Sequence, residues 1–157
     1  MGKIIFTKNE NKVQNNIRAI ADDQATIDLF DNYTSEIYDI VDISSAEYQD
    51  IKLLKKFIVS ESNGTFSYLD NVVFTSNVTH TVESCKSEQV RIISILDKWL
   101  ANAPANALKT KVQNYRTAVN NIDFDTLFSN AEFTFSGTIE NYIHEQGGTP
   151  VNILELL

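Results

Sequence analysis

The chain has 157 residues, of which 43% are hydrophobic and 22% are charged, and its single cysteine excludes an internal disulfide; a chain of this size and composition can bury a core without disulfides or metal ions. Its net charge of −8, with only 13 Lys and Arg residues, argues against nucleic acid as a partner, because phosphate binding needs basic clusters that release counterions. No apolar run reaches the ~20 residues of a membrane-spanning helix and the first residues do not resemble a signal peptide, so we expect a protein made in the cytoplasm that has no membrane contact.

The first part of the chain shows the pattern of short β-strands. Residues 3–7, KIIFT, are β-branched and aromatic, and the polar KNEN that follows predicts a turn into a second strand over residues 13–20. In EIYDIVDI, Ile37, Val41 and Ile43 lie at strand spacing and share one face. We therefore expect an N-terminal hairpin and a third strand.

A helix is expected to begin at Ser45. Ser44 lies three residues before Glu47, and in a capping box the hydroxyl and the carboxylate of such a pair each bind the other residue's backbone N–H group. The inner side of this helix is expected to carry Tyr48, Ile51 and Leu54, with Ile58 as a further candidate.

A tight turn is predicted at Asn63 and Gly64, between FIVSES and TFSYLD. Two-residue hairpin turns of the primed types require positive φ at both central residues, and Asn-Gly meets this requirement well. The two flanking segments are therefore expected to form a second β-hairpin.

From Val78 onwards the apolar spacing changes from that of a strand to that of a helix. The first helical stripe contains residues spaced alternately by four and three: Val78, Val82, Cys85, Gln89, Ile92, Leu96 and Trp99. After a break at Pro104, a second stripe repeats this spacing: Leu108, Val112, Tyr115, Val119 and Ile122. Two such stripes predict an antiparallel helical hairpin, since isolated helices of this length are only marginally stable.

Gln89 is a polar interruption of the first stripe. In a coiled coil such a residue can set the register or the oligomeric state of the helices. The alternative is a half-exposed position with no special role.

The end of the sequence combines a short helix with an apolar tail. TIENYIHEQ is expected to form a helix that ends at Gly147 and Gly148. The segment that follows Pro150, VNILELL, would be an aggregation hazard in water. We expect it either to pack on the core of its own chain or to dock on a neighbouring protein.

Asp123 and Asp125 in NNIDFDTLFSN are candidates for a catalytic aspartate pair. The stretch resembles the nucleophile motif of the haloacid dehalogenase superfamily, in which a Thr also follows the second aspartate. That family places one residue between the second aspartate and the Thr, whereas Thr126 directly follows Asp125 here. We therefore interpret Asp123 as the N-cap, or Asp125 as a first-turn acid, of a short helix around TLFSN.

The two histidines, His80 and His144, show none of the spacings typical of zinc sites, and no serine lies in a nucleophile motif. Both histidines are interpreted as surface residues. The sequence thus predicts no metal ion, no cofactor and no catalytic residue.

Three stretches resemble small proteins of contractile-tailed bacteriophages. YDIVDISSAEYQDIKLLKKFIVSESNGTFSYLDN is similar to the N-terminal domain of tail-assembly and tail-fibre-associated proteins. The second stretch is an expected helix that carries Trp99 and is followed by NYRTAVNNI; it is similar to the second region of the same proteins. The third is the ending ENYIHEQGGTPVNILELL, which is similar to the tails of small virion proteins of related marine phages.

This resemblance implies a non-catalytic structural protein of the virion that is made in the host cytoplasm. It would act as an adaptor in the tail, baseplate or neck, as a homo-oligomer or in several copies, with other phage structural proteins as its partners. A tail-fibre assembly chaperone is the alternative. A small hydrolase that uses Asp123 and Asp125 is a more remote one.

The elements together predict an α+β fold. Its parts are a β-rich N-terminal subdomain with one helix over residues 1–75, an antiparallel helical hairpin over residues 76–122, and a short mixed docking segment over residues 123–157. The residues expected to contact other proteins are Trp99, Tyr115, Val151, Ile153, Leu154, Leu156 and Leu157.

Overall fold

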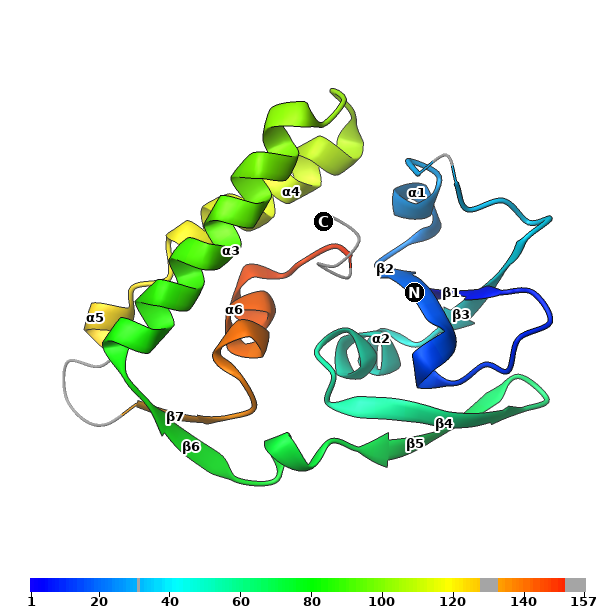
Figure 1. The fold of residues 1–157 in the computed structure, drawn as a ribbon, viewed down its shortest axis with the longest axis horizontal. Helices are drawn as coiled ribbons and strands as arrows, with labels where there is room; N and C mark the ends of the chain where they lie inside the picture. Colours follow the sequence, from blue (N-terminus) through cyan, green and yellow to red (C-terminus); the bar gives the residue numbers. More distant parts are fainter. Residues whose placement is uncertain (31, 128–132, 152–157) are drawn as a thin grey trace. The chain divides into compact units, whose positions relative to one another are not determined.

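The computed structural model describes residues 1–30, 32–127 and 133–151, and within them small antiparallel sheets and several helices form the α+β fold that the sequence predicts (Figure 1). The described residues divide into two compact units, Met1–Asn71 with Pro150 and Val151, and Val72–Thr149. The boundary after residue 71 lies close to the end of the predicted N-terminal subdomain. The described residues 123–127 and 133–149 of the predicted docking segment belong to the same unit as the helical hairpin.

The first unit is built on a three-stranded antiparallel sheet in which β1 lies between β2 and β3. β1 spans Gly2–Thr7, β2 spans Ile17–Ala21 and β3 spans Tyr38–Ile43. The N-terminal hairpin and the third strand are therefore confirmed. β2 begins later than expected because Gln14–Asn16 first forms a 3₁₀ turn.

Two helices of this unit begin with side-chain caps. α1, Gln24–Ile27, is short, and its N-cap is Asp23, whose carboxylate accepts a hydrogen bond from the backbone N–H group of Thr26. α2, Ser45–Lys52, begins with the predicted capping box. Ser44 Oγ accepts from Glu47 N at 3.2 Å, and Glu47 Oε2 accepts from Ser44 N at 2.9 Å.

Buried side chains from the sheet, α2 and the following strand form one core cluster: Ile4, Phe6, Ile20, Ile43, Tyr48, Ile51 and Ile58. Tyr48 packs so closely on β1 that a Cβ added to Gly2 would lie 2.4 Å from the tyrosine Cβ. The Tyr48 hydroxyl donates to Pro150 O at 3.1 Å, and Val151 forms an isolated antiparallel bridge with Ala21. The described end of the chain is thus held in the first unit.

Three apolar residues of this unit do not lie where the sequence pattern placed them: Ile37, Leu54 and Ile58, the last of which lies in the strand Lys56–Ser62 and not on α2. Ile37 precedes β3 and is exposed, so only Val41 and Ile43 of the predicted face contribute to the core. α2 ends at Lys52, and Leu54 follows it in a left-handed conformation, with φ of 57°, and is exposed. In each case the apolar spacing in the sequence continues beyond the end of the strand or helix that forms.

The second hairpin of the first unit is the one predicted from Asn-Gly. β4, Lys56–Ser62, pairs antiparallel with β5, Thr65–Asp70. Asn63 and Gly64 between them have φ of 50° and 80°. The turn is therefore confirmed, with both residues in the positive-φ region that it requires.

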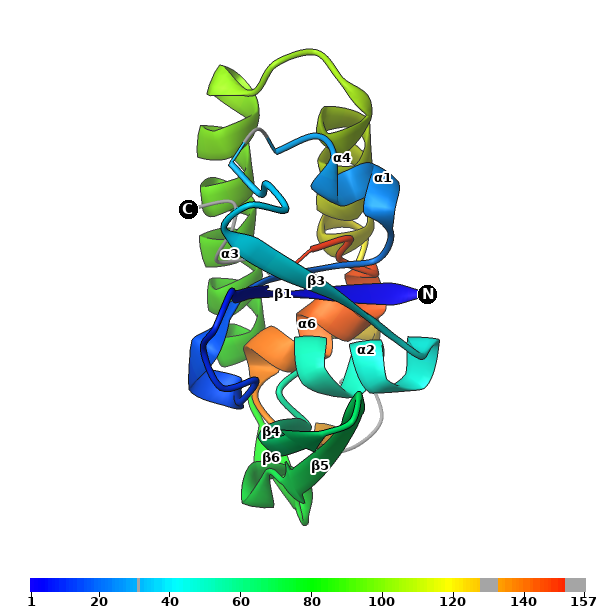
Figure 2. The same ribbon diagram turned by 90° about the vertical axis from the view of Figure 1, so that its right-hand side faces the viewer.

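The second unit contains a helical hairpin with further short elements. In chain order these are η2 (Val72–Phe74), β6 (Asn77–His80), α3 (Val82–Asn102), α4 (Ala107–Asn120), α5 (Phe124–Leu127), β7 (Phe133–Ser136) and α6 (Ile139–Gly147). Figure 2 shows α3 and α4 side by side and joined at one end, which confirms the predicted antiparallel hairpin. Among the described residues, none of the helices combines the length and the apolar character that crossing a bilayer requires.

The two predicted stripes supply most of the buried side chains of the hairpin: Cys85, Ile92, Leu96, Leu108, Val112, Tyr115 and Val119. Val78 is not part of the helix, contrary to the expectation, because it lies in β6 and is exposed. Ile122 follows the end of α4. The helical spacing therefore held within the helices and failed at both outer ends.

β6 and β7 form a two-stranded sheet that the sequence did not predict. Val78 lies opposite Phe135, and His80 lies opposite Phe133. The Phe135 ring is stacked between His80, at 4.0 Å between centroids, and Tyr142 of α6, at 4.5 Å. One face of the small sheet is therefore aromatic and packs against α6.

α6 is the predicted short helix and ends as expected at a glycine pair. Gly148 adopts the left-handed conformation, with φ of 66°, that commonly ends a helix. Gly147 lies against α4, where an added Cβ would be 2.4 Å from Cε2 of Tyr115. The missing side chain at this position allows α6 to approach α4 closely.

Candidate functional site

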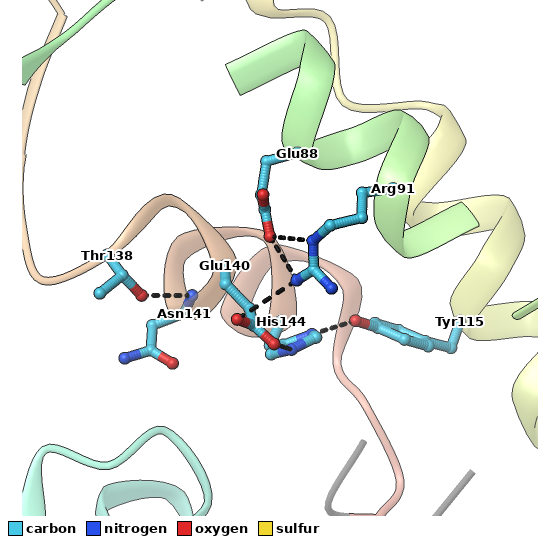
Figure 3. A network of polar contacts seen from close by, with 7 residues as sticks. All are labelled: Glu88, Arg91, Tyr115, Thr138, Glu140, Asn141 and His144. Carbon is cyan, nitrogen blue, oxygen red and sulfur yellow. Dashed lines mark hydrogen bonds and ion pairs between the residues drawn. The ribbon is translucent and has the colours of Figure 1, made fainter. Parts of the chain in front are cut away.

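A chain of polar contacts joins three helices of the second unit (Figure 3). The Tyr115 hydroxyl on α4 is hydrogen-bonded to Nδ1 of His144 on α6, and Nε2 of His144 lies 3.3 Å from Oε1 of Glu140. Oε2 of Glu140 lies 3.3 Å from Nη2 of Arg91 on α3. Arg91 Nε also donates to Glu88 Oε1 at 2.8 Å.

Helical spacing places these groups. Glu140 and His144 are four residues apart on α6, and Glu88 and Arg91 are three apart on α3, so each pair lies on one side of its helix. Thr138 fixes the start of α6, because its hydroxyl accepts a hydrogen bond from the backbone N–H of the third residue of the helix at 3.1 Å. Sequence spacing accounts for the pairs within each helix. The contacts from one helix to another, Tyr115 to His144 and Glu140 to Arg91, form because the three helices pack together.

The inner end of this network is closed to water. Tyr115 is 2% exposed and His144 is 5% exposed. Burial, together with the nearby charge of Glu140, raises the pKa of Tyr115 above its ordinary value. The Tyr115 hydroxyl therefore keeps its proton, and the two ring nitrogens of His144 join this hydroxyl to the Glu140 carboxylate.

Glu140 is the acidic member at the edge of the network. The hydrogen bond from His144 lowers the pKa of Glu140, and the positive charges of His144 and Arg91 add to this effect. Acid, imidazole and hydroxyl thus follow one another as they do in catalytic relays. Here the hydroxyl points into the packed interior, so the arrangement holds α3, α4 and α6 together.

The sequence interpretation of His144 as a surface residue is therefore wrong. In the structure one ring nitrogen of His144 pairs with a carboxylate on its own helix and the other with Tyr115 on another helix. His80 is partly buried against Phe135, and this burial lowers the pKa of His80.

Asp123 and Asp125 have structural partners, as the capping interpretation predicts. Asp123 Oδ1 accepts a hydrogen bond from Thr126 N at 3.1 Å at the start of α5, and its other oxygen binds the Thr126 hydroxyl. These hydrogen bonds lower the pKa of Asp123. Asp125 forms an ion pair with Lys86 on α3.

The structure separates the residues that were expected to contact other proteins. Trp99 is partly exposed on α3 and remains available for contact. Tyr115 and Val151, at 2% and 1% exposed, are buried within their own chain, so the assignment of these two residues to an interface is corrected. The other four expected contact residues lie outside the described part of the chain: Ile153, Leu154, Leu156 and Leu157.

Gln89 has a role within its own chain. Its side-chain Nε2 donates to Val119 O at 2.7 Å and to Ile122 O at 3.0 Å. The last carbonyl groups of a helix have no partner inside the helix, and Gln89 on α3 supplies one for the end of α4. The polar interruption of the stripe marks this contact.

Exposed apolar side chains gather in the segment that leads into β6. Val72, Val73 and Val78, which we call the valine segment, are 78%, 45% and 49% exposed. Val73 O accepts a hydrogen bond from Gly137 N at 3.1 Å, which holds the beginning of this segment beside the end of β7. The backbone is therefore held in place, and the three valine side chains remain exposed on it.

Comparisons of this chain with protein-family models, with curated proteins and with solved structures found no match. Within residues 1–30, 32–127 and 133–151, no group of three His, Cys, Asp or Glu side chains is arranged to hold a metal ion.

Proposed function

We propose that this chain is a non-catalytic structural protein of a phage virion, an adaptor in the tail, baseplate or neck that acts through protein–protein interfaces. The sequence resemblance supports the phage assignment. The surface of the second unit supports the mode of action. The partners would be other phage structural proteins, contacted by several copies of this chain.

The valine segment is the observation that carries this proposal. Fully burying one such side chain stabilises a complex by roughly 1.5–3 kcal/mol, so Val72, Val73 and Val78 together offer a large gain to a partner that covers them. Single exposed apolar residues are ordinary, whereas several on one fixed segment are typical of an interaction surface.

The polar residues that first suggested chemistry support the same conclusion. Asp123 caps α5, Asp125 pairs with Lys86, and His144 is enclosed within the second unit. Each side chain thus has a structural partner within the second unit.

Mass spectrometry of purified virions tests the proposal. We expect this chain in finished particles at a constant copy number. A chain that is abundant in infected cells but missing from the particles would contradict a structural role and would favour the assembly chaperone.

A second experiment tests whether the valine segment makes the contact. Val72→Ser combined with Val78→Ser is expected to reduce incorporation into particles while the isolated protein stays folded. Val90→Ser is the matched control, because the exposed fraction of Val90, 63%, lies between those of Val72 and Val78, and Val90 lies on α3 outside the segment. Equal incorporation of both variants would exclude the valine segment as the contact surface.

A further inference from the structure

The sheet of the first unit leaves one side of β3 open. β3 pairs with β1, and no other strand in the described part of the chain pairs with it. Lys8 N donates to Ile37 O at 2.8 Å, and in an antiparallel ladder hydrogen-bonded pairs alternate with non-bonded pairs. This register turns the backbone N–H and C=O groups of Ile40 and Asp42 away from β1.

The preceding chain covers only the beginning of this side. Tyr38 N donates to Thr34 O at 2.9 Å, so the first outward N–H group of the strand is occupied. The outward backbone groups of Ile40 and Asp42 have no partner among the described residues. We call Tyr38, Ile40 and Asp42 the β3 edge.

Aromatic side chains flank the occupied end of the β3 edge. The Tyr33 ring lies 5.4 Å from the Tyr38 ring and 5.9 Å from the Phe30 ring, both in edge-to-face geometry. Ile37 is exposed immediately before the strand. A strand added beside β3 would therefore find apolar contacts as well as backbone hydrogen bonds.

The charge around the edge indicates the kind of partner. Residues 19–51 include nine Asp and Glu residues and no Lys or Arg. Glu36 is exposed just before β3, and Asp39 and Asp42 within the strand each form an ion pair with a lysine of the same unit. These ion pairs neutralise Asp39 and Asp42, so the attraction of a basic segment depends on Glu36 and on the net charge of −8 of the chain, which also makes two copies repel one another.

We propose that the β3 edge binds an extended segment of another protein in which Lys or Arg alternates with apolar residues, and that this segment joins the sheet as a fourth strand. Backbone hydrogen bonds to Ile40 and Asp42 set its register. Its apolar residues pack beside Tyr38, and its basic residues lie near Glu36. The binding depends on the geometry and charge of the edge and not on the virion assignment.

A panel of short synthetic peptides in which Lys alternates with Val, Ile or Phe tests the proposal with the complete chain. We expect saturable binding, and protection of the Ile40 and Asp42 amide protons from hydrogen exchange in NMR spectra. Matched peptides in which Glu replaces Lys should not bind. Absence of binding by all the basic peptides, equal binding of the acidic ones, or protection confined to other strands would each overturn the proposal.

Three variants separate binding at the edge from general attraction of charge. Ile40→Pro removes one outward N–H group, and proline is tolerated on edge strands, so we expect affinity to fall about tenfold. Glu36→Lys should weaken binding without touching the sheet, whereas Asp70→Lys, the same charge change on β5, should weaken it less. Equal effects of Glu36→Lys and Asp70→Lys would overturn the proposal even if Ile40→Pro failed to fold.

Discussion

The Tyr115 hydroxyl on α4 is hydrogen-bonded to Nδ1 of His144 on α6, and both side chains are buried in the second unit. This bond is the innermost step of a network that continues through Glu140 to Arg91 on α3. Three helices from distant parts of the sequence are therefore tied by one set of polar side chains. Because buried polar groups are costly without partners, the pair fixes how α6 packs on the hairpin.

Tyr115→Phe tests this bond directly. The ring is retained, but Nδ1 of His144 loses its partner, and we expect the free energy of unfolding to fall by about 1–3 kcal/mol. Urea denaturation followed by circular dichroism measures the change. The double variant Tyr115→Phe with His144→Leu should lose less than the sum of the two single changes. Strict additivity would show that the two side chains do not depend on each other.

Glu140 is expected to make stability depend on pH. Its pKa in the folded protein lies below the ordinary value of 4.5, chiefly through the hydrogen bond from His144. Its stabilising contribution is therefore complete above pH 4.5 and is lost as the pH falls through the lower folded-state pKa. Urea denaturation over this range should show a shallower loss of stability on acidification for Glu140→Gln than for the unchanged protein.

The control for this pH series is Glu83→Gln, the same chemical change at the exposed start of α3. It should leave the dependence of stability on pH close to that of the unchanged protein. Identical curves for all three proteins would show that the network around Glu140 does not contribute.

The sequence predicted correctly those elements that depend on residues close together in the chain. The capping box of Ser44 and Glu47 and the turn at Asn63 and Gly64 each depend on residues close in sequence, and both are present as predicted. The two helical stripes also predicted their hairpin, because each stripe reports burial along one helix.

Contacts between distant segments were not predictable in the same way. β6 and β7 are four residues long and pair across the whole helical hairpin, so neither strand shows a recognisable pattern alone. Val78 fitted the helical spacing by coincidence and lies in β6. The burial of His144 depends on Tyr115 from another helix, and a single sequence gives no sign of that approach.

Gln89→Leu is expected to destabilise the hairpin even though it makes the buried stripe more apolar. Leucine cannot donate to Val119 O and Ile122 O, so the end of α4 loses its partner on α3. We expect thermal unfolding to report a loss of about 1–3 kcal/mol. Gln113→Leu, on the exposed side of α4, is the control and should change stability little. A stabilised Gln89→Leu protein would show that hydrophobic burial outweighs the two hydrogen bonds.

Gly147 and Gly148 are adjacent but are required for different reasons, and alanine at each should give different results. At Gly147 the new Cβ would lie 2.4 Å from Cε2 of Tyr115, so the ring must move, at a cost of about 1–3 kcal/mol for an overpacked core. At Gly148 no atom lies within 4 Å of the new Cβ, and the penalty is the left-handed backbone with φ of 66°, roughly 1–2 kcal/mol for an L-residue.

Stability alone does not separate these two alanine variants, but the His144 ring does. Displacement of the Tyr115 ring by Gly147→Ala should break or lengthen the bond to Nδ1 and shift the imidazole resonances of His144 in NMR spectra. Gly148→Ala leaves that ring in place and should leave the resonances unchanged. The chain has two histidines, so the His80 signals provide an internal reference. Unchanged His144 signals in Gly147→Ala would show that the added methyl group is accommodated without displacing the Tyr115 ring, and would contradict the steric role given to Gly147.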